Sequence, residues 1–99
     1  MEIIKTRDGE TLTITLKGKL DSNTAPELEA DLVGAYEGVK LLIWDFEELK
    51  YLSSAGLRIL LSAQKIMNTQ GKMVLRHVND IIMETFDMTG FSSILTFED

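Results

Sequence analysis

Residues 39–67 read VKLLIWDFEELKYLSSAGLRILLSAQKIM, and this stretch decides the fold class of the chain. Its first part, Val39–Trp44, is a near-continuous apolar run, which is typical of a central strand covered on both faces of a sheet. An acidic turn is predicted at Asp45–Glu48. From residue 54 to about residue 69, apolar side chains recur at helical spacing, and Gly71 is predicted to end this helix. The stretch therefore predicts a strand, a loop and a helix in succession, which is the building unit of parallel α/β sheets.

The segments on either side extend this alternation of strands and helices. Ile3–Thr6 and Thr11–Leu16 are predicted strands, and the turn residues Asp8–Gly9 between them favour a hairpin. Strands and helices then alternate from residue 24, which predicts a mostly parallel sheet with right-handed crossovers. The other predicted elements are a helix capped by Asn23 or Thr24, with Pro26 in its first turn and a buried stripe of Leu28, Leu32 and Ala35; a strand at Lys72–Arg76; a helix capped by Asn79 and ended by Gly90; and a short strand at Ser93–Phe97. We therefore predict one α/β domain over residues 1–99, with a mixed, mostly parallel β-sheet that is opened by an N-terminal hairpin and packed with helices.

The composition fits a single small domain that acts through its surface. The chain has 99 residues, of which 44% are hydrophobic and 26% charged, so it is an ordinary globular chain with little room for a deep substrate cavity. It has no cysteine, which excludes disulfides, thiolate nucleophiles and cysteine-based metal sites and is compatible with a reducing compartment. Its longest apolar run, Leu41–Trp44, is far too short to cross a bilayer, and its N-terminus lacks a signal-peptide layout. We therefore expect a cytoplasmic protein that does not bind membranes.

The charge balance favours a protein partner. Ten basic residues against sixteen acidic ones give a net charge of −6, and the lysines and arginines are scattered singly along the chain. Such a surface repels phosphate backbones and anionic membranes on balance. The sequence therefore predicts no direct nucleic-acid binding, and it favours a protein partner with a basic face.

Ser53–Gly56 is the candidate functional site. Two consecutive hydroxyl residues, Ser53 and Ser54, precede the strongly apolar helix, so one of them is well placed as its N-cap. Capping alone accounts for a serine here, because the hydroxyl satisfies a backbone N–H that the helix leaves unpaired. The small residues Ala55 and Gly56 also allow another backbone or a phosphate to approach closely. At this point the sequence leaves both a structural cap and a binding site open.

Four stretches of the chain resemble one known family in their order and spacing. They are Gly18–Ala25, Leu42–Phe46, Leu49–Leu60 and Phe86–Phe91, and they cover nearly the whole chain. They are similar to the corresponding stretches of STAS domains, in particular of free-standing bacterial anti-sigma factor antagonists, also called anti-anti-sigma factors. The resemblance implies a STAS-like fold that has no enzymatic activity and needs no cofactor. It also implies that the partner is an anti-sigma factor serine kinase of the histidine-kinase-like ATPase type, and it leaves room for a serine phosphatase.

The resemblance further implies roles for single residues. In such proteins the head of this helix commonly reads aspartate, serine, serine or threonine, glycine, and the partner kinase phosphorylates the first serine. That serine falls on Ser54, whereas Ser53 stands where aspartate is usual and Ala55 where the second hydroxyl is usual. The implied switch binds the kinase while Ser54 is free and releases it when Ser54 is phosphorylated. The residues predicted to bind the partner are Asp21, Ser53, Ser54, Ala55, Gly56 and Arg58.

Three charged residues near this motif also have ordinary structural interpretations. Asp21 matches the family's aspartate after the second strand, but it also suits a turn in which its carboxylate accepts backbone N–H groups. Arg58, one turn into the helix, is suited to pair with a phosphate on Ser54 or with an acidic partner, although an exposed arginine needs neither role. Asp45 either helps to order the loop below Ser54 or is simply solvated.

Two other functions stay open from the sequence alone. The first is a constitutive adaptor of the same fold, a subunit of a transporter or signalling complex in which Ser54 is only a cap; Ser53 and Ala55 favour it. The second is a small flavodoxin-like nucleotide-binding protein. The lack of a glycine-rich phosphate-binding loop argues against this function. His77 is the single histidine, which excludes a multi-histidine metal site, and no Gly-x-Ser-x-Gly motif supports a Ser–His–Asp triad. We therefore predict no catalytic and no metal-binding residue.

Overall fold

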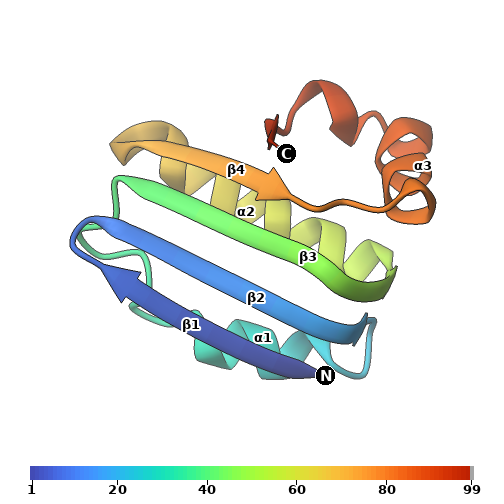
Figure 1. Cartoon of the computed structure of the whole chain (residues 1–99), viewed down its shortest axis with the longest axis horizontal. Helices are drawn as coiled ribbons and strands as arrows, with labels where there is room; N and C mark the ends of the chain where they lie inside the picture. The colour runs from blue at the N-terminus through green and yellow to red at the C-terminus, as the bar shows by residue number, and fades with distance from the viewer. Residues whose placement is uncertain (99) are drawn as a thin grey trace.

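Five strands form one sheet in the computed structural model of the chain, which describes residues 1–98. The strand order is β1-β2-β3-β4-β5, with β1 antiparallel to β2 and every later strand parallel to its neighbour (Figure 1). The strands are β1 Glu2–Asp8, β2 Thr11–Leu20, β3 Leu41–Leu52, β4 Lys72–Arg76 and β5 Phe97–Glu98. The predicted α/β class, the opening hairpin and the mostly parallel sheet are therefore confirmed.

Three α-helices and one short 3-10 helix connect these strands. They are α1 Ala25–Asp31, α2 Ser54–Gln70, α3 Asp80–Thr89 and the 3-10 helix η1 Phe91–Ser93. Figure 1 shows α1 and α2 behind the sheet and α3 beyond the end of β4. No helix within residues 1–98 is long and apolar enough to cross a membrane.

The core lies on one side of the sheet only. Leu28 of α1, Leu60 of α2 and Phe86 of α3 all belong to one cluster of buried side chains, from which Ile43 and Val74 are absent. These two residues face each other on the opposite side of β3 and β4, where they are buried without a helix above them. The prediction that β3 is covered on both faces by other elements is therefore wrong. The largest fully buried side chains are Trp44, Phe46, Phe86, Ile14, Leu16, Leu20, Leu28, Leu42, Leu49, Leu60, Met67 and Met73.

β3 is much longer than the sequence predicts. It continues through Asp45–Glu48, so the predicted acidic turn is wrong. The reason is a pair of register shifts, at each of which β3 carries one residue more than the facing part of β2. Buried positions consequently change from a spacing of two at Trp44 and Phe46 to a spacing of three at Leu49 and Leu52. This irregular spacing hides the strand from a search for strict alternation.

The predicted boundaries of α2 and α3 are confirmed. α2 runs from Ser54 to Gln70 and ends at Gly71. The Asn79 side chain accepts a 2.9 Å hydrogen bond from the Ile82 N–H and so caps α3. Gly90 ends α3 in the left-handed conformation, with φ of 80°.

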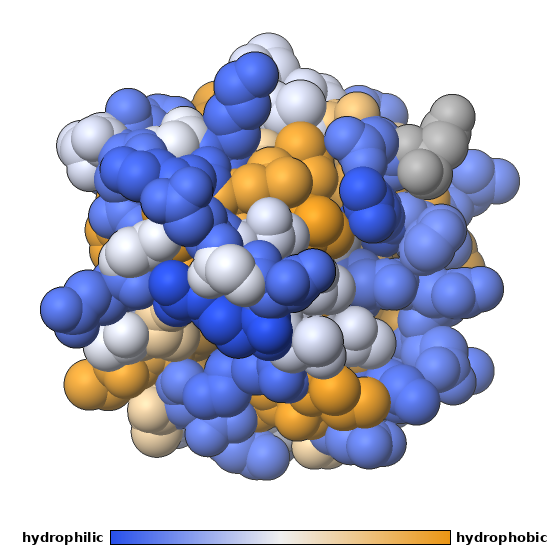
Figure 2. Space-filling model, turned by 60° about the vertical axis from the view of Figure 1, so that its left-hand side comes forward, coloured by the Kyte–Doolittle hydropathy of each residue, from blue (hydrophilic) through white to orange (hydrophobic). Residues whose placement is uncertain are grey.

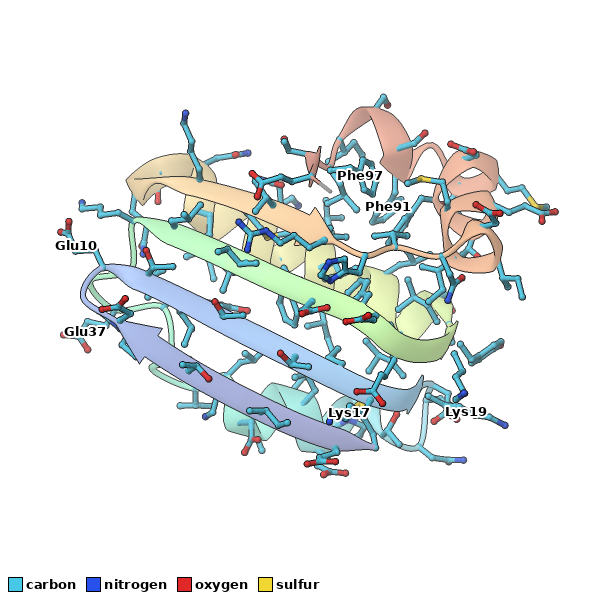
Figure 3. The ribbon with its side chains drawn as sticks, viewed as in Figure 1. Glu10, Lys17, Lys19, Glu37, Phe91 and Phe97 are labelled. Atoms are coloured by element: carbon cyan, nitrogen blue, oxygen red, sulfur yellow. The ribbon has the colours of Figure 1, made fainter. Side chains whose placement is uncertain are left out.

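Two smaller predictions need correction. The last strand, predicted at Ser93–Phe97, is only Phe97–Glu98, because η1 occupies the start of the predicted segment. Figure 3 shows Phe91 and Phe97 between β4 and α3, and both pack against the core. The first helix ends at Asp31, so Ala35 lies in the turns that follow it and not on a helical stripe.

Candidate functional site

The candidate site lies at the edge of the sheet where β2 and β3 end. The two strands run in parallel, and their last residues, Leu20 and Leu52, face each other in register. The Ser53 N–H donates a 2.9 Å hydrogen bond to the Leu20 carbonyl, which extends the pairing beyond β3. Asp21 therefore leaves β2 beside the start of α2. Figure 1 shows this edge on the right, with α1 and α2 both running away from it.

Ser53 and Ser54 have different positions at the start of α2. Ser53 is the N-cap residue, with extended backbone at ψ of 176°, so the prediction that one serine stands at the cap is confirmed. Its hydroxyl makes no capping bond, however, and its buried Oγ has no hydrogen-bond partner within residues 1–98. Ser54 is the first helical residue and is exposed. The first N–H groups of α2 therefore lack a side-chain cap, which suits an anion at this position.

Gly56 faces the sheet and not the solvent. It is buried, and a Cβ at this position would lie 2.5 Å from Leu52 Cδ1 and 2.8 Å from Leu20 Cγ. The small residue thus permits a close approach, as the sequence suggested, but the approaching groups belong to the protein's own core. Gly56 positions α2 and offers no surface of its own, whereas half-buried Ala55 lines a groove between α1 and α2.

The carboxylate of Asp21 organises the loop between β2 and α1. Its Oδ1 accepts the backbone N–H groups of Thr24 at 3.1 Å and Asn23 at 2.9 Å. These bonds, to Thr24 first and Asn23 second, hold the pKa of Asp21 below its usual value. The Thr24 hydroxyl donates to the carbonyl of Lys19, which Figure 3 shows at the end of β2. The turn interpretation of Asp21 is confirmed, and its half-exposed charge remains available at the site.

Arg58 is the predicted site residue that lies farthest along α2. It is exposed, lies one turn after Ser54, and forms no ion pair in the part of the chain that the structure describes. With Ala55 it lines the groove between α1 and α2, whose second wall the sequence prediction missed. Helical spacing could not have revealed that wall, because α1 ends at Asp31 and most of the wall lies in the turns after it. The wall consists of Glu29, Leu32, Val33 and Tyr36.

A separate polar group lies where β3 and β4 run side by side. His77 Nδ1 is 3.0 Å from Asp45 Oδ1 and 3.9 Å from Glu47 Oε2, and these three atoms could contact one cation. The His77–Asp45 contact is sufficient to explain the grouping, and among residues 1–98 no serine bonds His77, so we assign it neither a metal nor a triad. Asp45 also accepts the Glu47 N–H, and these contacts give it no part in ordering the loop below Ser54.

The His77–Asp45 pair predicts a measurable pH dependence. The hydrogen bond that His77 donates to the Asp45 carboxylate, followed by the negative charge of that carboxylate, raises the pKa of His77. Burial acts to raise the pKa of Asp45, but the bonds from His77 and the Glu47 N–H outweigh it and lower that pKa. The pair therefore stabilises the fold most between the unfolded pKa of aspartate, about 3.9, and that of histidine, about 6.5. It stabilises the fold less as pH rises through the folded pKa of His77 or falls through the folded pKa of Asp45.

We therefore expect Asp45→Asn to bring the pKa of His77 down toward its ordinary value. The measurement is an NMR titration, which follows one imidazole because the chain has a single histidine. Glu47→Gln is the matched control and should shift the pKa less, since its carboxylate lies farther away at 3.9 Å. Equal effects of the two variants would contradict the assignment of Asp45 as the main partner.

The face that Figure 2 shows is mostly hydrophilic. Figure 2 brings the left-hand side of Figure 1 forward, and there apolar atoms form separate areas among hydrophilic residues. The residues predicted to bind a partner are at the other end of the strands, after Leu20 and Leu52.

Comparison with known proteins agrees with the sequence and the fold. The STAS domain matches residues 2–99. BtrV of Bordetella bronchiseptica, a candidate anti-sigma factor antagonist, is 38% identical over 85 residues, which are 84% of this chain and 73% of BtrV. The anti-sigma-B factor antagonist of Listeria monocytogenes is 33% identical over 95 residues, which cover 93% of this chain and 82% of that protein. The chain therefore belongs to the STAS domain family, among the anti-sigma factor antagonists.

A solved structure supports the same fold. The unphosphorylated form of the anti-sigma factor antagonist SpoIIAA aligns with a TM-score of 0.77, covering 99% of this chain and 88% of the SpoIIAA chain at 22% identity. At this level of identity the likeness concerns the fold. The predicted STAS-like fold and family are thus confirmed.

Proposed function

We propose that this protein is a phosphorylation-controlled anti-sigma factor antagonist that binds an anti-sigma serine kinase of the histidine-kinase-like ATPase type. In this proposal the kinase binds while Ser54 carries a free hydroxyl and leaves when Ser54 is phosphorylated. The observation that carries the proposal is the position of Ser54, exposed at the first residue of an uncapped helix and beside the charge of Asp21. The protein itself acts as a binding regulator and performs no chemistry.

A phosphate on Ser54 is compatible with the fold. It would add about −1.5 to −2 charges at the positive end of α2, where free N–H groups and the helix dipole favour an anion. SpoIIAA has been solved in unphosphorylated and phosphorylated forms, and the two align with this chain at TM-scores of 0.77 and 0.76. Phosphorylation therefore leaves that fold in place, and we expect the effect here to lie in the charge of the docking surface. A serine phosphatase would restore the binding form.

The adaptor function is the alternative that specific residues favour. Ser53 stands in place of the aspartate of the usual motif, and Ala55 in place of its second hydroxyl. A protein that is never phosphorylated needs neither the aspartate nor that hydroxyl. Phosphate transfer separates the two functions, because an adaptor would accept none.

The test is incubation with the cognate anti-sigma kinase and Mg-ATP, followed by mass spectrometry. We expect one phosphate, mapped to Ser54, and its complete loss in Ser54→Ala. Ser53→Ala is the matched control and should still be phosphorylated, because the Ser53 hydroxyl is buried. Transfer to Ser53, or to neither serine, would remove the proposed switch.

Asp21 provides a second prediction for the docking surface. Asp21→Arg should weaken kinase binding by more than about fivefold, since it reverses the charge beside Ser54. It should also lower the melting temperature, because it removes the acceptor of the two N–H bonds. Asp21→Asn keeps an acceptor oxygen, so it should weaken binding while melting close to the native protein. Native-like binding of both variants would remove Asp21 from the site.

A further inference from the structure

A groove between α1 and α2 adjoins Ser54 and is lined largely by apolar side chains. Its volume is about 460 Å³, which lies within the range of ligand-binding pockets. Leu32, Val33 and Tyr36 lie on the α1 side, and Ala55 and Ile59 lie on the α2 side. Val33 is 84% exposed, so its side chain is accessible to a partner at the groove.

The α2 wall of the groove has the periodicity of a helix surface, whereas most of the opposite wall lies in the turns that follow α1. The lining residues on α2 span Ala55 to Ser62, so the groove is about 10 Å long, or two helical turns. An apolar groove of this shape suits a single amphipathic helix that inserts side chains spaced by one turn.

The charges at the groove favour a protein segment over a nucleotide. Arg58 lies on the α2 wall and Glu29 on the α1 wall. A single guanidinium opposed by a carboxylate is a poor site for several phosphates, but it complements a helix that carries both signs of charge. Arg58 has no ion-pair partner among residues 1–98, so its guanidinium is available.

We propose that this groove receives one amphipathic helix of the anti-sigma factor, with apolar side chains between α1 and α2 and a carboxylate on Arg58. The proposal rests on the proposed function, because it names the part of the partner that lies next to Ser54. It also assigns Arg58 a role in release. Ser54 and Arg58 are four residues apart on α2, the spacing at which an anion followed by a cation pairs best on a helix. A phosphate on Ser54 pairs with the guanidinium of Arg58, which is then no longer available to the partner's carboxylate.

The docking part is tested with the kinase that phosphorylates Ser54, by measuring its Kd for native and variant proteins. Val33→Glu places a charge in the groove at an exposed position, so it should weaken binding about tenfold or more without unfolding the protein. Met88→Glu is the matched control, because Met88 is a similarly exposed apolar side chain, at 79%, on α3. It should change the Kd by less than about twofold.

Three results would overturn this docking site. The first is native-like binding by Val33→Glu, and the second is an equal loss of affinity in Met88→Glu. The third is a native protein that is a dimer in light scattering while Val33→Glu is a monomer, which would assign the groove to a second copy of this chain. If Ser54 accepts no phosphate, the proposed function fails; if Ser54 is phosphorylated while Val33→Glu binds normally, only the groove is wrong.

The Arg58 part is tested without the kinase, on protein carrying phosphoserine at position 54 by codon reassignment. A ³¹P NMR titration measures the second pKa of the phosphate. Arg58→Gln should raise that pKa by about half a unit or more, because it removes the paired cation. Lys65→Gln, an exposed cation two to three turns farther along α2, should leave it unchanged. Identical titrations of the native and Arg58→Gln proteins would overturn the release mechanism.

Discussion

Ser54→Asp is expected to lose binding to the anti-sigma kinase by about tenfold or more, while Ser54→Ala binds like the native protein. The aspartate introduces part of the charge that phosphorylation would add, at the position where the partner docks. It should nevertheless fold at least as well as Ser54→Ala, because a carboxylate in the first turn of α2 is favoured by the helix dipole by about 0.3–1 kcal/mol. Binding and stability are therefore expected to change in opposite directions.

The affinity for the kinase is measured by isothermal titration calorimetry, and the stability of the same samples is measured by thermal unfolding. A Ser54→Asp protein that is both less stable and weaker in binding would point to damage of the fold. Native-like binding of Ser54→Asp, together with no phosphate transfer to the native protein, would establish the adaptor function instead.

Gly56→Val should destabilise the domain by about 1–3 kcal/mol and weaken kinase binding as a consequence. The new Cβ alone would meet Leu52 Cδ1 at 2.5 Å and Leu20 Cγ at 2.8 Å, and the two leucines are buried and have little room to move. α2 would have to shift away from the strand ends, and Ser54 with it. Helix propensity acts in the other direction, since valine is a better helix former than glycine, but by less than about 1 kcal/mol.

Lys65→Val is the control, because it places the same side chain at an exposed position of the same helix. It should change the free energy of unfolding, measured by urea titration, by no more than about 0.5 kcal/mol. If Gly56→Val has the same urea midpoint of unfolding as the native protein, the close approach of α2 to the sheet is not required.

The boundaries of α2 and α3 could be predicted from the sequence because their signals are local. Gly71 and Gly90 end α2 and α3, and Asn79 caps α3, so one short segment contains all the information that sets each boundary. β3 could not be predicted beyond Trp44, because its bulges depend on how it pairs with β2 and not on its own sequence. The adjacent acidic residues Glu47–Glu48 then read as a turn, although both are strand residues.

In the candidate site, too, the features set by local sequence could be predicted, and those set by packing between distant segments could not. The positions of Ser53 and Ser54 at the head of a helix follow from the sequence, whereas the direction of Gly56 toward the core depends on Leu20, more than thirty residues away. The groove has residues from α1, from the turns that follow it and from α2, and only the packing of these segments brings its walls together. The His77–Asp45 contact joins residues 32 positions apart, and no sequence pattern links them.

The packing of α2 against the ends of β2 and β3 affects the rates at which the complex with the kinase forms and dissociates. The bond from Ser53 to Leu20 and the packing of Gly56 fix Ser54 in place before any partner arrives. A surface ordered in advance gives up little conformational entropy when it binds, so association needs no slow rearrangement of this domain. We therefore expect phosphorylation of Ser54 to act chiefly by shortening the lifetime of the complex, with little effect on the time needed to form it at high salt.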